Sequence, residues 1–126
     1  MLMLGTNDLK QRFSLPAGDV DRSMALLVQT VMQSCSGPDD RRPRILVVSP
    51  MPVEEVGYLA EMFTGGAPKS RGVAEANAGV AALHGTSFFD AGTVIAASPV
   101  DGIHFDAASH AALGAAIAEK IKGMDL

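Results

Sequence analysis

Short apolar runs alternate along the chain with longer segments in which hydrophobic residues recur at helical spacing. The apolar runs cover residues 1–4, 45–48 and 86–89, and a loop rich in glycine, proline or aspartate follows each of them. Buried strands that are joined by helices pair in parallel through right-handed crossovers. The pattern therefore predicts an α/β protein of order β-α-β-α-β-α.

Three segments between and after these runs carry the helical pattern. Pro16 and Asp19 suit the first turn of the first helix, Gly37 and Pro38 end it, and Gly85 ends the second helix. The expected apolar stripes are Val20, Met24, Leu27, Val28, Val31 and Cys35; then Val73, Ala76, Val80 and Leu83; then Leu113, Ile117 and Ile121.

Composition narrows the class of protein. The 126 residues suit one domain, and 10 basic against 14 acidic residues give a net charge of −4. No basic field exists to bind nucleic acid or an anionic membrane, so neither is an expected partner. The single cysteine excludes an internal disulfide, and no secretion signal is recognisable at the N-terminus, so we expect a cytoplasmic protein.

The segment with the most chemistry is Asp101-Gly102-Ile103-His104. A carboxylate three residues before a histidine can bind one imidazole nitrogen while the other nitrogen faces a pocket. That arrangement is the base and its orienting partner in a nucleophilic triad. The alternative is a surface histidine beside a helix that Asp106 caps.

A second polar segment, Gly5-Thr6-Asn7-Asp8, follows the first apolar run. An asparagine amide can donate a hydrogen bond to a developing oxyanion, whereas the alternative is an Asx-turn. The carboxyl ends of parallel strands share one sheet edge, so we expect Asn7 and His104 in one crevice.

Together these segments resemble the SGNH, or GDSL-type, hydrolase family. The G-x-N-D block matches residues 5–8 and the D-x-x-H block matches residues 101–104. Residues 4–10, 48–50 and 88–92 add similarity to the arylesterase-like branch, so the resemblance spans essentially the whole chain.

The resemblance implies a flavodoxin-like three-layer α/β sandwich that hydrolyses carboxylic esters through serine, histidine and aspartate, without a cofactor. His104 would be the general base, Asp101 its orienting partner and Asn7 an oxyanion donor. The expected substrate-binding residues are Gly5, Met51, Pro52 and Phe105.

The family's Gly-Asp-Ser block and its second glycine block have no counterpart here. The only Gly-Asp pair, Gly18-Asp19, precedes Val20. Residues 1–126 therefore resemble a single partial domain, the C-terminal part truncated to the last three strands. We expect the chain alone to be inactive, and either to be unstable or to associate, as a homo-oligomer or otherwise, through its exposed first strand.

Two other interpretations remain open. The first is a non-catalytic flavodoxin-like binding or interaction module. The second is a metal site, whose candidate ligands are His104, Asp106 and His110, with Asp101 or Asp90. It is disfavoured because His104 and His110 are six residues apart across a helix start. The third histidine, His84, is expected to face solvent.

Overall fold

The structure, a computed structural model, describes residues 1–124 and is a mixed α/β fold. Strands β1 (Leu46–Ser49) and β2 (Ser87–Asp90) form a parallel two-stranded sheet, with Leu46 opposite Ser87. The second and third predicted strands are thereby confirmed, each one residue further along the chain than expected.

The first predicted strand, residues 1–4, is reduced to a single parallel bridge between Leu2 and Val47. Leu2 N–H donates to the Leu46 carbonyl at 2.9 Å, and Val48 N–H donates to the Leu2 carbonyl at 2.8 Å. Gly5 then turns the backbone away with a φ of 119°. The segment lies where a third strand would lie, but it is too short to continue the ladder.

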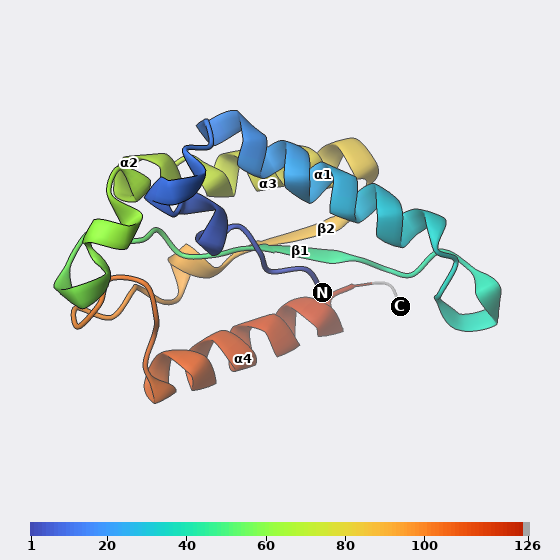
Figure 1. Cartoon of the computed structure of the whole chain (residues 1–126). Helices are drawn as coiled ribbons and strands as arrows, with labels where there is room; N and C mark the ends of the chain where they lie inside the picture. Colours follow the sequence, from blue (N-terminus) through green and yellow to red (C-terminus); the bar gives the residue numbers. More distant parts are fainter. Residues whose placement is uncertain (125–126) are drawn as a thin grey trace.

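Helices cover both faces of the sheet, with α1 and α3 on one face and α4 on the other (Figure 1). No helix within residues 1–124 combines the length and apolar character that a membrane crossing requires. The helices are α1 (Ala17–Gln33), α2 (Gly66–Ser70), α3 (Val73–His84) and α4 (Ala107–Lys122), and 3₁₀ turns η1 to η6 cover Thr6–Leu9, Gln11–Phe13, Pro38–Asp40, Gly57–Leu59, Glu61–Phe63 and Ala91–Thr93.

The three predicted helices are present, whereas α2 was not expected. Four stripe residues were wrong, because the structure leaves them exposed: Cys35, Leu83, Leu27 at 37% and Ile121 at 36%. Cys35 lies beyond the end of α1 in an exposed loop with a φ of 48°. Leu83 is 78% exposed, because the buried face of α3 follows Val73, Val80 and Ala81. Gly85 caps α3 in the left-handed conformation, as the sequence predicts.

Strand β1 is buried on both faces, and its side chains alternate between two hydrophobic clusters. Val47, with Ile45 just before the strand, packs against Met24 and Val28 of α1 and Val80 of α3. On the other face, Leu46 and Val48 pack in the cluster that contains Leu113 of α4. This double burial holds β1 between the two clusters, and the loop that begins at Pro50 follows its C-terminal end.

We predict that Met24→Ala lowers the free energy of unfolding by about 2–5 kcal/mol, because it empties a core site. Met24 is 2% exposed, whereas Leu26 on the same helix is 64% exposed. Leu26→Ala is therefore the matched control and changes stability by less than about 0.5 kcal/mol. Equal losses in urea denaturation would contradict this assignment of the core.

Candidate active site

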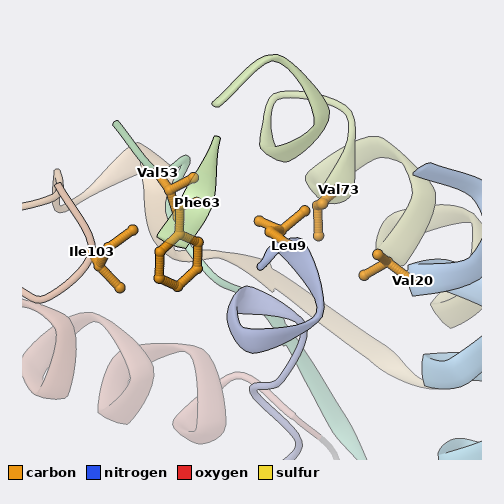
Figure 2. Close-up of a cluster of buried hydrophobic side chains, with 6 residues drawn as sticks. All are labelled: Leu9, Val20, Val53, Phe63, Val73 and Ile103. Atoms are coloured by element: carbon orange, nitrogen blue, oxygen red, sulfur yellow. The ribbon is translucent and has the colours of Figure 1, made fainter. Parts of the chain in front are cut away.

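A hydrophobic cluster brings together the two polar segments that the sequence singles out (Figure 2). Leu9 comes two residues after Asn7, and Ile103 directly precedes His104. Both side chains are buried, at 5% and 7% exposure, and Phe63 is 1% exposed in the same cluster. The full cluster is Leu9, Val20, Val53, Phe63, Val73 and Ile103.

Asp101 and His104 form the hydrogen-bonded pair that the D-x-x-H spacing predicts. His104 Nδ1 lies 2.7 Å from Asp101 Oδ2. The carboxylate side chain is 8% exposed and the imidazole 70% exposed. Because an ionised carboxylate only accepts hydrogen bonds, Nδ1 carries the proton and Nε2 of a neutral imidazole is left to accept one.

The Asp101 carboxylate is held as an anion by backbone donors as well as by the imidazole. Its Oδ1 accepts hydrogen bonds from the N–H groups of Ile103 and His104, both at 2.9 Å. The Ile103 N–H, the His104 side chain and the His104 N–H lower the pKa of Asp101 from 3.8 to about 2. The carboxylate therefore stays charged at neutral pH and orients the ring.

The loop around this pair is closed by further backbone and capping bonds. Ser98 N–H donates to the His104 carbonyl at 2.6 Å. Asp106 caps α4 by accepting from Ser109 N–H at 2.8 Å, as the alternative interpretation of this segment predicted, and that bond lowers the pKa of Asp106. His104 is thus fixed between a closed loop and a capped helix.

Asn7 lies in turn η1 and shares a cleft with His104. Backbone bonds close the turn, from Asp8 N–H to the Gly5 carbonyl at 3.1 Å and from Lys10 N–H to the Asn7 carbonyl at 3.3 Å. The cleft has a volume of about 330 Å³ and is lined by Met3, Thr6, Asn7, Pro50, Met51, Ile103, His104, Phe105 and His110.

The residues expected to bind substrate divide into three groups. Met51 and Phe105 line the cleft. Gly5 lines an adjoining groove, which is described below. Pro52 lines neither; it is exposed, and its Cδ lies 3.0 Å from where a Cβ on Gly92 would stand. The alternation of side chains along strand β1 ends before Pro50. The place of Pro52 in the sequence therefore did not predict that it lies outside the cleft.

Two histidines differ from what the sequence suggested. His110, considered only as a metal ligand, packs against Phe105 with ring centroids 4.2 Å apart and the ring planes tilted by 42°, and it lines the cleft. His84 was expected to face solvent, but its Nε2 is buried without a hydrogen-bond partner among the described residues. Within residues 1–124 no cluster of three or more histidine, cysteine, aspartate or glutamate residues has the arrangement of a metal site.

The lowered pKa of Asp101 predicts an acid-side loss of stability. A carboxyl whose folded-state pKa lies below its unfolded value stabilises the fold above about pH 4 and loses that contribution as the pH falls toward 2. Asp101→Asn removes this component, so the variant's denaturation midpoint depends less steeply on pH between 5 and 2. Asp39→Asn, at a 79% exposed side chain, is the control and keeps the wild-type slope.

No protein-family model and no curated protein matches the chain. Solved structures do match. The native aryl esterase of M. smegmatis superposes with a TM-score of 0.87 at 38% identity, over 95% of this chain and 58% of that one. The carbohydrate acetylesterase Est24 from Sinorhizobium meliloti gives 0.89 at 34% identity, with the same two coverages.

The chain thus spans little more than half the length of these esterases, while almost all of it is matched. These structures confirm the resemblance inferred from the motifs: the chain is similar to the C-terminal part of an SGNH-type hydrolase.

Proposed function

We propose that the chain supplies the base, its orienting carboxylate and an oxyanion donor to a hydrolase of carboxylic esters. One observation carries the proposal: His104, which is hydrogen-bonded to Asp101, lines the same cleft as Asn7. The identity of 34–38% to an aryl esterase and a carbohydrate acetylesterase supports the esterase class. The arrangement of helices on both sheet faces supports a truncated flavodoxin-like sandwich, and one exposed cysteine, Cys35, accords with a cytoplasmic protein.

In the proposed reaction, a serine hydroxyl attacks the ester carbonyl while His104 Nε2 takes the hydroxyl proton. Asp101 stabilises the imidazolium that forms, and the Asn7 amide donates to the oxyanion. Collapse of the tetrahedral intermediate breaks the bond to the alcohol, which leaves with the proton from His104. Water then repeats the sequence on the acyl-enzyme, releasing the acid.

The serine is the part that residues 1–126 do not provide in this proposal. The lining residues of the cleft include one hydroxyl side chain, Thr6, and no serine. We propose that the nucleophile comes from polypeptide outside these residues, corresponding to the part of the M. smegmatis aryl esterase that this chain does not cover.

A groove beside the cleft suits such a segment. It has a volume of about 660 Å³ and runs between residues 3–8 and helix α1. Leu4 and Leu26 line it and are 51% and 64% exposed. The N–H and carbonyl of Leu2 form hydrogen bonds with β1. Because backbone groups alternate in direction along an extended chain, those of Met3 face away from β1, toward the open edge of the sheet. We propose that an added strand pairs there.

We predict that the chain alone neither hydrolyses an activated aryl ester with a burst nor reacts with a fluorophosphonate at one defined residue. Refolding it with the uncovered part of the M. smegmatis enzyme restores hydrolysis. His104→Ala abolishes the restored activity, and Asn7→Ala lowers kcat by about 100- to 1000-fold. Stoichiometric labelling of one residue in the chain alone would refute the division of the machinery, and a mixture without activity would favour a binding module.

We also predict that the chain by itself associates in sedimentation experiments at micromolar concentration, because an open apolar edge pairs with other copies. Leu4→Lys places a charge in the groove and shifts the chain toward monomer. The control Leu83→Lys changes a leucine that is 78% exposed on α3, and it leaves the distribution unchanged. A wild-type monomer that melts cooperatively would argue against the open edge.

A further inference from the structure

The segment 53–58 lies against the loop that carries Asp101 and His104. Val53 packs in the same cluster as Ile103. Glu54 N–H donates to the Gly102 carbonyl at 2.8 Å. A buried side chain and a backbone hydrogen bond therefore tie this segment to the loop, although the two lie more than 40 residues apart in the sequence.

Two glycines set the distance between these backbones. Gly57 has a φ of 65°, and a Cβ there would stand 1.9 Å from the Val100 carbonyl oxygen. Gly102 has a φ of 71°, and its Cβ would stand 1.8 Å from the Glu54 carbonyl oxygen. Since neither approach tolerates a side chain, the segment and the loop meet at a spacing that only glycine allows.

Tyr58 directly follows Gly57 and reaches the carboxylate of the pair. Its hydroxyl donates a long hydrogen bond of 3.4 Å to Asp101 Oδ2. His104 Nδ1 contacts the same oxygen at 2.7 Å. The tyrosine is 75% exposed, so burial does not explain where its ring lies.

We propose that Gly57 and Tyr58 are positioning residues for His104. Gly57 sets how closely the segment approaches the loop, and Tyr58 shares the Asp101 oxygen that orients the imidazole. The consequence for ester hydrolysis rests on the proposed function, whereas the contact of Tyr58 with Asp101 does not. The tests of this proposal therefore measure the His104 hydrogen bond and the Tyr58 contact directly, without measuring ester hydrolysis.

The first test records the His104 Nδ1–H resonance in the chain by NMR. Gly57→Ala forces the loop away, so the downfield signal of the hydrogen-bonded proton is lost or moves upfield. Gly65→Ala is the matched control, because Gly65 has a φ of 78° with no atom within 4 Å of its Cβ position. Equal effects of both variants would overturn the role of Gly57.

The second test uses Tyr58→Phe, which keeps the ring and removes only the hydroxyl. Loss of the competing donor strengthens the bond from His104 to Oδ2, so the Nδ1–H resonance moves downfield, opposite to the Gly57→Ala effect. The ring signals of His84 and His110 stay in place. An unchanged His104 resonance would overturn the role of Tyr58.

An optical measurement checks the same contact without a variant of Tyr58. The chain has one tyrosine and no tryptophan, so its tyrosine fluorescence reports Tyr58 alone. The carboxylate quenches this emission, and Asp101→Asn raises it, whereas Asp106→Asn does not. Equal emission in the wild type and Asp101→Asn would refute the contact. Absence of esterase activity in the refolded mixture would refute the proposed function and leave these three results standing.

Discussion

The packing of Leu9 and Ile103 in one cluster with Phe63 is the interaction on which the candidate site depends. Each large apolar side chain contributes about 1.5–3 kcal/mol when it is fully buried. A single hydrogen bond on the surface contributes less, about 0.5–1.5 kcal/mol. The turn that carries Asn7 and the loop that carries His104 are therefore brought together mainly by hydrophobic burial behind the cleft, and the polar groups then take their positions on that support.

Within the site, the structure separates the fixed charge from the accessible base. The Asp101 carboxylate is almost fully covered and holds two backbone donors on one oxygen. His104 is largely exposed and makes its oriented contact through one nitrogen. This division suits a proton acceptor that must meet an incoming group while its orientation stays constant.

Much of this arrangement follows from local sequence. The spacing of Asp101 and His104 predicts their contact, the cap at Asp106 follows from its place before an apolar helix, and β-branched residues identify β1. Features that depend on distant segments did not follow from it. Residues 1–4 have the composition of a strand but have a sheet neighbour on one side only. Tyr58 reaches the site through tertiary packing, for which its local sequence gives no signal.

Strand β1 has one further consequence, which concerns insertions and deletions. Because both of its faces accept apolar side chains, a slip of one residue would still bury valine and leucine, so hydrophobicity alone does not define the alignment. Pro43 and Pro50 stand on either side of the strand, and neither has an N–H to extend the ladder. The two prolines thus limit the segment that can pair. An insertion or deletion between the two prolines would move Pro50 into the sheet or Pro43 toward it. The loops at the cleft would then no longer be aligned.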